Sequence, residues 1–369
     1  MSDLPALGWT GEFAATFAPH AEAGFEPARV AAEHRGRYTV RAADGDRDAR
    51  VTGRFRHEAT RAADFPAVGD WVAITGGADG EASLIQAVLP RRSAFSRSGR
   101  DSTATGQIHA SDEQVIAANI DVVFLVAGLD GDLNLRRLER YIALAWSSGA
   151  EPVLVLNKAD LVPDVAPAMA EVASVAGGMP VLAVSALTGQ GIERLRDWLG
   201  AGRTAALLGM SGVGKSTIVN ALLGEERQAT APVREDDQRG RHTTTHRELI
   251  DLPSGGLLLD TPGMRALELF GADEGIEVAF ADIAALAGGC RFADCAHERE
   301  PGCAVRAALD SGELAGARFE SYRKLIREVR SAEIRSDPRA QAAEARRWRA
   351  IHKSVDKHMK QKYGEGTRR

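Results

Sequence analysis

The stretch from Gly209 to Ser216 has the pattern G-x-x-x-x-G-K-S, whose residue types suit the binding of phosphate groups. Glycines let backbone N–H groups turn inward around phosphate oxygens, and the dipole of a following helix favours negative charge. Lys215 would neutralise the β- and γ-phosphates, and the Ser216 hydroxyl would ligate Mg²⁺. A glycine-rich turn without a ligand is the weaker interpretation, because an apolar run precedes the pattern and a helix-like segment follows it. The predicted nucleotide contacts here are Gly209, Met210, Ser211, Gly212, Val213, Gly214, Lys215, Ser216 and Thr217.

A second phosphate motif, running from Asp260 to Gly263, follows the apolar run 257–259. An aspartate at the end of a buried strand beside a phosphate loop is placed to hold Mg²⁺, and the Gly263 N–H can approach a γ-phosphate because no side chain obstructs it. The polar stretch 240–246, with three threonines, lies between the two motifs. One of these hydroxyls could complete the magnesium shell, although threonines are also ordinary loop residues. By position we expect Mg²⁺ to be held by Ser216, Thr244 and Asp260.

The base would be recognised by the sequence Asn-Lys-Ala-Asp at 157–160, directly after the apolar run 153–156. Ligands bind at the carboxyl ends of strands in open α/β sheets. A carboxylate there can accept hydrogen bonds from N1–H and the exocyclic amino group of guanine, and adenine lacks both donors. A backbone N–H of the next strand's cap could bind the guanine O6. The pattern therefore selects GTP over ATP, through Asn157, Lys158, Ala159, Asp160, Ser185 and Ala186.

All three cysteines of the chain gather with one of its nine histidines in the pattern Cys290-x4-Cys295-x-His297-x5-Cys303. Three thiolates and one imidazole make a closed tetrahedral shell, and thiolates favour zinc over Mg²⁺ or Ca²⁺. With four protein ligands no position stays open for a reacting water, so the expected role is structural. Three buried thiols or a redox sensor are the alternatives.

The elements that position these motifs are predicted from the apolar periodicity. Fully apolar runs separated by helical stretches such as 133–149 predict a parallel sheet covered on both faces; they are 122–126, 153–156, 181–186 and 205–208. The segments 247–252 and 256–260 suggest a hairpin joining that sheet, and from about residue 275 the chain reads as helical.

Residues from about 28 to 92 predict the short strands of a small antiparallel barrel, including a strand over 48–55. Nine arginines between positions 29 and 61 are interleaved with Tyr38 and Phe55. Nucleic-acid-binding barrels use such a mixture for phosphate contact and base stacking. A solvated strand face is an equally good interpretation, because acidic residues dilute the charge.

The chain has 369 residues, 44% of them apolar, and a formal net charge of -5. Residues 331–369 hold eleven Lys and Arg against five Asp and Glu, so a tail of +6 follows an acidic body of -11. This tail suggests an RNA-binding arm or a solvated helix. An odd cysteine count argues against a secreted disulfide framework, and apolar runs stop far short of the roughly 20 residues that cross a bilayer. We expect a soluble, cytoplasmic protein without membrane contact.

The motif order is base recognition, Ser-Ala, phosphate loop, threonine stretch and Asp-Thr-Pro-Gly, a circular permutation of the ordinary GTPase order. With the barrel before it and the cysteine cluster after it, the chain from about 28 to 330 resembles the ribosome small subunit-dependent GTPase family. The resemblance implies an α/β protein with an N-terminal OB-fold β-barrel, a circularly permuted P-loop GTPase domain and a C-terminal helical zinc-binding domain. It also implies a late assembly factor that binds small-subunit rRNA and couples GTP hydrolysis to its release. We expect the protein to be a monomer. The expected boundaries are 1–108 (arm and barrel), 109–272 (GTPase), 273–335 (zinc) and 336–369 (basic tail).

The residue that organises the attacking water is the open question in this sequence. Met264 follows the Asp-Thr-Pro-Gly motif where many small GTPases carry a glutamine, and a thioether cannot orient water. The nearest polar candidate is His242, and the resembling family implicates a histidine at this position; capping of the loop is the alternative role. Two other functions remain open, a GTP-gated rRNA-binding module with incidental hydrolysis and a zinc-handling GTPase, the latter disfavoured by the closed ligand shell.

Overall fold

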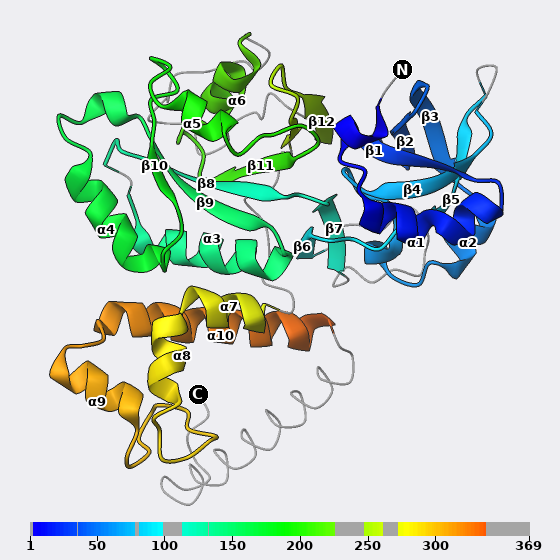
Figure 1. Ribbon diagram of the computed structural model, residues 1–369. Coiled ribbons are helices and arrows are strands. Elements are labelled where there is room, and N and C mark those ends of the chain that lie inside the picture. The colour runs from blue at the N-terminus through cyan, green and yellow to red at the C-terminus, as the bar shows by residue number, and fades with distance from the viewer. Residues whose placement is uncertain are drawn as a thin grey trace, which may run out of the picture.

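The computed structural model describes residues 3–34, 36–77, 81–98, 113–131, 133–225, 247–260 and 272–336. Figure 1 shows a barrel beside a twisted sheet, with a group of helices below one face of that sheet. The expected order of barrel, α/β sheet and helical segment is therefore present. No helix among these described residues is long and apolar enough to cross a membrane.

Five strands close the N-terminal barrel in the order β1-β2-β3-β5-β4, with β4 pairing back onto β1. All pairs are antiparallel except β3 with β5. Alternate residues fill the interior, among them Val30, Val40, Ile74 and Ile85, each fully buried. The strands are β1 (Glu26–His34), β2 (Arg37–Ala42), β3 (Gly45–Val51), β4 (Trp71–Thr75) and β5 (Ser83–Val88). The predicted barrel is confirmed.

The strand predicted over 48–55 is only half correct. Strand β3 ends at Val51, and helix α2 (Gly53–Glu58) begins after Thr52, whose hydroxyl accepts a hydrogen bond from the Phe55 N–H at 3.1 Å. A threonine in the N-cap position offers this bond to a helix, so the local capping chemistry overrides the alternating pattern.

An N-terminal helix that the sequence pattern did not predict packs on the barrel. Helix α1 (Gly11–Glu22) buries Phe13 and Phe17, and the ring of Trp9 lies 4.6 Å from that of Trp71, measured between centroids. Because these aromatic rings shield one another from water, the N-terminal arm is part of the barrel's packing.

The central sheet has the order β10-β9-β8-β11-β13-β12, and all neighbouring pairs are parallel except β12 with β13. Strand β12 also pairs with barrel strand β1, with Ala32 opposite Glu248, so barrel and sheet are hydrogen-bonded to each other. The strands are β8 (Val122–Gly128), β9 (Glu151–Asn157), β10 (Val181–Ala183), β11 (Thr204–Gly209), β12 (Arg247–Asp251) and β13 (Leu257–Asp260). A separate hairpin, β6 (Ala94–Ser98) with β7 (Glu113–Ala118), lies between barrel and sheet (Figure 1).

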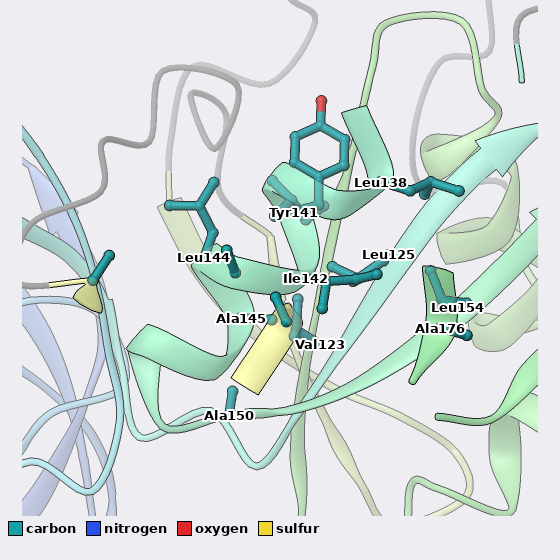
Figure 2. Close-up of a cluster of buried hydrophobic side chains, with 14 of the residues drawn as sticks. Val123, Leu125, Leu138, Tyr141, Ile142, Leu144, Ala145, Ala150, Leu154 and Ala176 are labelled. Carbon is teal, nitrogen blue, oxygen red and sulfur yellow. The ribbon is translucent and has the colours of Figure 1, made fainter. Parts of the chain in front are cut away.

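Helices cover both faces of the sheet, as predicted: α3 (Leu135–Ser148) and α4 (Ala166–Ala176) on one, α5 (Ile192–Arg196) and α6 (Lys215–Leu223) on the other (Figure 1). Helix α3 starts after Asn134, whose side chain accepts from the Arg137 N–H, and ends at Gly149 with φ 84°. Leu138, Ile142 and Ala145 point from it toward the sheet strands β8 and β9 (Figure 2). Their spacing puts them on one helical face.

Two of the C-terminal helices, α7 (Asp273–Ala279) and α10 (Gly316–Ser336), pack against the outer side of α3. Helix α8 (Ala281–Ala287) packs on α7, and α9 (Ala304–Ser311) packs on α8. A Cβ atom added at Gly275 would lie 2.4 Å from the Ala143 carbonyl oxygen, so only glycine permits this approach of α7 to α3. Arg318 of α10 also forms an ion pair with Glu139 at 3.0 Å.

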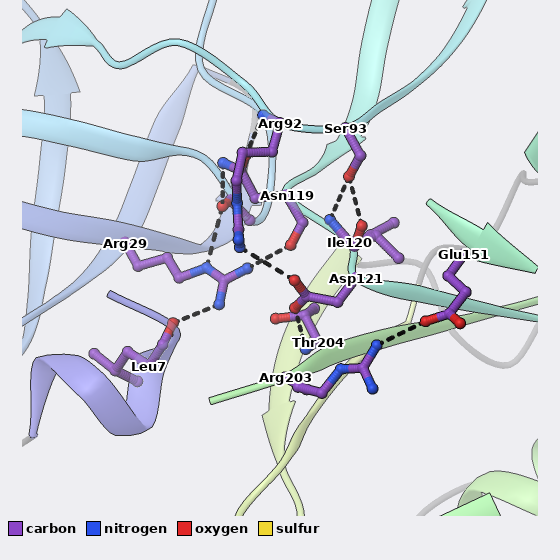
Figure 3. Close-up of polar contacts among 11 residues, drawn as sticks. Leu7, Arg29, Arg92, Ser93, Asn119, Ile120, Asp121, Glu151, Arg203 and Thr204 are labelled. Carbon is purple, nitrogen blue, oxygen red and sulfur yellow. Dashed lines mark hydrogen bonds and ion pairs between the residues drawn. The ribbon is translucent and has the colours of Figure 1, made fainter. Parts of the chain in front are cut away.

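The buried side chain of Arg29 ties the arm, the barrel and the sheet together (Figure 3). It is 1% exposed and donates hydrogen bonds to the carbonyl oxygens of Leu7, Gly69 (3.1 Å) and Asn119 (2.9 Å). Desolvation lowers the pKa of Arg29 to about 10, which still leaves it charged at neutral pH. The sequence counted Arg29 among possible RNA contacts, and its burial excludes that role.

Candidate nucleotide and metal sites

The phosphate loop joins the end of β11 to the start of α6, as the sequence predicts. Gly214 precedes the helix with φ 93°, and a Cβ atom there would lie 2.3 Å from the Asn157 side-chain nitrogen. A Cβ atom at Gly209 would lie 2.4 Å from the Val126 carbonyl oxygen. Both ends of the loop therefore require glycine, which leaves backbone N–H groups as the surface that a ligand would meet.

Lys215 lies across the mouth of this loop. Its ammonium group donates hydrogen bonds to the carbonyl oxygens of Gly209 at 2.8 Å and Met210 at 2.5 Å. Ser216 and Thr217 follow in the first turn of α6 and are half-buried, whereas Ser211 and Gly212 form the exposed rim of the loop. The Lys215 ammonium group and the N-terminus of α6 thus lie at the same loop, and their combined positive charge suits the binding of an anion.

Asn157 connects the three nucleotide motifs. Its side chain is 3% exposed, donates to the Val213 carbonyl oxygen at 2.9 Å and accepts from the Ala186 N–H at 3.0 Å. One buried amide therefore holds the phosphate loop, the end of β9 and the Ser-Ala segment together. The motif pattern alone does not reveal this role.

The rest of the base-recognition motif surrounds Asp160. The Ser185 hydroxyl donates to the Asp160 carboxylate at 2.5 Å, and the buried Ala159 N–H donates to the Val184 carbonyl oxygen at 3.0 Å. Lys158 has φ 67° and forms an ion pair with Asp130. These contacts fix the orientation of a carboxylate that is itself exposed at the edge of the sheet.

The N–H groups of Ser185 and Ala186 differ from their predicted role. The Ser185 N–H donates to the Gln190 carbonyl oxygen at 2.9 Å, and that of Ala186 donates to Asn157. One N–H of this segment was expected to bind the guanine O6, and both of its N–H groups donate to acceptors within the protein here. In this structure the segment holds Asn157 and Asp160 in position.

Asp260 ends strand β13, the neighbour of β11, and therefore lies on the same edge of the sheet as the phosphate loop. The other residues predicted to contact magnesium, the γ-phosphate or the attacking water are Thr244, Gly263 and His242, and all of them lie outside the described residues.

The predicted metal ligands come together. The ligand atoms of Cys290, Cys295, His297 and Cys303 lie within 4.8 Å of one another. The Cys290 and Cys303 sulfurs are 3.8 Å apart, and the His297 Nδ1 is 3.6 and 3.4 Å from them. A tetrahedral zinc ion with ordinary bond lengths needs about 3.8 Å between two sulfurs and about 3.6 Å between sulfur and nitrogen. The cluster can therefore hold a metal ion of that size.

Backbone donors and neighbouring sulfurs shape the charge of this cluster. Burial alone would raise the pKa of Cys290, but hydrogen bonds from the Val305 and Ala304 N–H groups at the start of α9 lower it. Desolvation and then the hydrogen-bonded and charged sulfur neighbours raise the pKa of Cys295 to about 11. Three thiolates this close together require a cation among them.

A basic groove lies on the outer surface of the barrel. It has a volume of about 420 Å³ and is lined by Gly36, Arg37, Ala49, Arg50, Val51, Arg56 and Ala82. The three arginines are exposed. Tyr38, by contrast, is only 4% exposed, and Phe55 packs against Phe65 with 5.9 Å between ring centroids, so the base-stacking role is not supported for Tyr38.

Comparison with known proteins agrees with this architecture. The chain is 51% identical over 358 residues to the small ribosomal subunit biogenesis GTPase RsgA of Opitutus terrae, covering 95% of this chain and 96% of the relative. It is 42% identical over 366 residues to the protein of the same name from Syntrophotalea carbinolica, covering 99% and 100%.

Solved structures show the same fold. YjeQ from Thermotoga maritima aligns with a TM-score of 0.59 and 27% identity, over 83% of this chain and 98% of that one. YloQ, described as a circularly permuted GTPase, aligns with a TM-score of 0.58 and 24% identity, over 83% and 96%. The sequence model of the RsgA GTPase family matches residues 88–270. The chain therefore belongs to the RsgA GTPase family, as its permuted motif order predicted.

Proposed function

We propose that GTP binds at the edge of the sheet where the phosphate loop, the Asn-Lys-Ala-Asp motif and the Ser-Ala segment meet. The observation that carries this proposal is the buried side chain of Asn157, which hydrogen-bonds to the other two motifs at once. The loop from Gly209 to Thr217 would hold the phosphates, and the Asp160 carboxylate would accept from guanine. The Ala186 N–H would donate to the guanine O6 only if it gave up its present hydrogen bond to the Asn157 side chain.

Magnesium would be bound together with GTP, through Ser216, Thr244 and Asp260, and the Gly263 N–H would approach the γ-phosphate. His242 would position the attacking water, because Met264 has no group that can do so. The metal cluster would hold one structural zinc ion, since four protein ligands close its coordination shell. Zinc would keep the loop 290–303 folded and take no part in hydrolysis.

The partner of this GTPase would be the small ribosomal subunit, on which its relatives are named to act. We divide the chain into an arm and RNA-binding barrel (1–108), a permuted GTPase domain (109–272), a zinc-binding domain (273–335) and a basic tail (336–369). The exposed arginines of the barrel groove are suited to phosphate groups of rRNA. The protein would act in the cytoplasm, as a monomer, late in assembly, and hydrolysis would release it.

GTP turnover measured with and without purified small subunits tests this function. Strong stimulation by the subunits, and none by large subunits, is the expected result. Subunit binding that is sensitive to salt but leaves turnover unchanged would instead favour a GTP-gated rRNA-binding module. If His242→Ala retained stimulated turnover with normal GTP binding, the water-positioning role of His242 would be abandoned.

A further inference from the structure

A carboxylate that is not a metal ligand lies inside the metal-binding loop. Glu300 accepts hydrogen bonds from the backbone N–H groups of Ala296 at 3.1 Å, Glu298 at 2.8 Å and Arg299 at 3.0 Å. The first bond goes to one carboxylate oxygen and the other two go to the second. Both oxygens of Glu300 are thus used to hold one turn of the backbone.

This turn carries two of the four ligands. The Ala296 N–H belongs to the peptide unit that follows Cys295, and the Glu298 N–H belongs to the unit that follows His297. His297 itself has φ 59°, a left-handed conformation that residues with a side chain rarely adopt without support from their surroundings. Glu300 therefore fixes the backbone on which Cys295 and His297 are mounted.

The other two ligands are held by different contacts. The Cys303 sulfur accepts from the Arg306 N–H at 3.4 Å at the start of α9, and N–H groups of the same helix start reach Cys290. The Arg291 N–H donates to the Gly302 carbonyl oxygen at 3.0 Å, which closes this side of the loop. The loop thus has two supports, helix α9 for Cys290 and Cys303, and Glu300 for Cys295 and His297.

Glu300 is charged at any pH at which the cluster would bind metal. Hydrogen bonds from backbone N–H groups, its own first and then those of Glu298, Arg299 and Ala296, lower its pKa to about 2. A charged carboxylate accepts stronger hydrogen bonds than a neutral amide does. The turn needs an acceptor at this place, because the N–H groups of Ala296, Glu298 and Arg299 all donate to the Glu300 side chain.

We propose that Glu300 is a positioning residue of the metal site, whose carboxylate fixes the turn that presents Cys295 and His297 to the ion. The inference rests on the metal site proposed above. Loss of a group that supports metal ligands typically weakens metal binding by about 10- to 100-fold. We therefore expect metal release from Glu300→Ala to be about 10- to 100-fold faster than from the native protein.

The experiment uses the full-length protein loaded with one equivalent of zinc and mixed with an excess of a chromophoric chelator. Glu300→Gln should fall between the native protein and Glu300→Ala, because its amide keeps an oxygen for the Glu298 and Arg299 donors but turns an NH₂ group toward Ala296. This milder variant decides the question if Glu300→Ala fails to fold. Asp294→Asn is the matched control, since it removes one exposed carboxylate next to Cys295.

The outcomes separate the two proposals. A native protein that retains no zinc overturns the metal site itself. A native protein that retains zinc while both Glu300 variants release it at the native rate overturns only the role of Glu300. Equal acceleration by Asp294→Asn would mean that charge, and not the hydrogen-bonded turn, holds the ion. Loading with Co²⁺ should give the same tetrahedral visible absorption in Glu300→Gln as in the native protein, and a changed ligand set would contradict positioning.

Discussion

Replacing Asn157 with alanine should disconnect the phosphate loop from the base-recognition motifs. The substitution removes the bonds to the Val213 carbonyl oxygen and the Ala186 N–H, at 2.9 and 3.0 Å. Each of the two buried groups left without a partner costs about 1–3 kcal/mol, so we expect a loss of about 2–6 kcal/mol in the free energy of unfolding.

The same two bonds set the expected loss in GTP affinity. If each bond contributes about 1 kcal/mol to keeping the loops in their binding arrangement, about 2 kcal/mol of the GTP binding free energy must be used in the variant to reorder those loops. This corresponds to a dissociation constant up to about 30-fold higher. Titration with a fluorescent GTP analogue, together with thermal unfolding of the nucleotide-free protein, measures both quantities.

Asn119→Ala is the matched control for this experiment. Asn119 is also buried, 1% exposed, and its side chain also makes two bonds to the backbone, accepting from the Arg92 N–H and donating to the Gly69 carbonyl oxygen. Its φ of 54° adds a cost of about 1 kcal/mol for alanine. It should lose at least as much stability as Asn157→Ala and keep native GTP affinity. Native affinity in Asn157→Ala, despite lower stability, would refute the linking role.

Three further predictions concern the base, the barrel and the C-terminal helices. Asp160→Asn should weaken GTP binding at least about tenfold, because the charge-assisted hydrogen bonds from the base to the carboxylate are lost. It should also reduce the preference for GTP over inosine triphosphate, which competition binding measures. Arg56→Ala should weaken binding to the subunit and make the plot of log binding constant against log salt concentration less steep by about 1. Arg54→Ala should change neither quantity, because Arg54 lies outside the groove on the same helix. Burial alone would raise the pKa of Asp282, but its contact with Arg318 at 2.6 Å lowers it. A lowered folded-state pKa gives stability that is present above about pH 4 and lost as the pH falls further. Asp282→Asn should therefore lower the melting temperature at pH 7 much more than at pH 3, and an equal effect at both would contradict the ion pair.

The nucleotide motifs were predictable because their positions follow from local patterns. Each lies next to a fully apolar run, and such runs form the parallel strands whose carboxyl ends meet at one edge of a sheet. The metal cluster was predictable for a similar reason, since all its ligands lie within the short stretch from Cys290 to Cys303. Spacing along the chain was enough to bring these groups together.

The connections between motifs were not predictable, because they depend on contacts between distant segments. Asn157 bonds to Val213, and Arg29 bonds to Leu7 and Asn119. No periodicity marks a buried arginine, which remains stable only where carbonyl oxygens from several segments converge on it. For this reason the sequence placed Arg29 among candidate RNA contacts. A buried Arg29 without these acceptors would destabilise the fold. Arg29 therefore favours the one arrangement of barrel and sheet in which all the acceptors reach it.

Helix α3 places a physical limit on how the C-terminal helices can respond to the nucleotide. The chain enters α7 soon after Asp260, so nucleotide-dependent changes have a short covalent route to this domain. However, Gly275 of α7 is pressed against the Ala143 carbonyl oxygen of α3, and Arg318 pairs with the buried Glu139. Pulling the helices away from α3 would break that pair and expose the apolar contacts between α7, α10 and α3, although Glu139 would keep its second ion pair with Arg136 of α3. A nucleotide-driven change that does not supply the free energy to break these contacts would move α3 and the C-terminal helices together. The metal-binding loop should then move with the sheet as one rigid body.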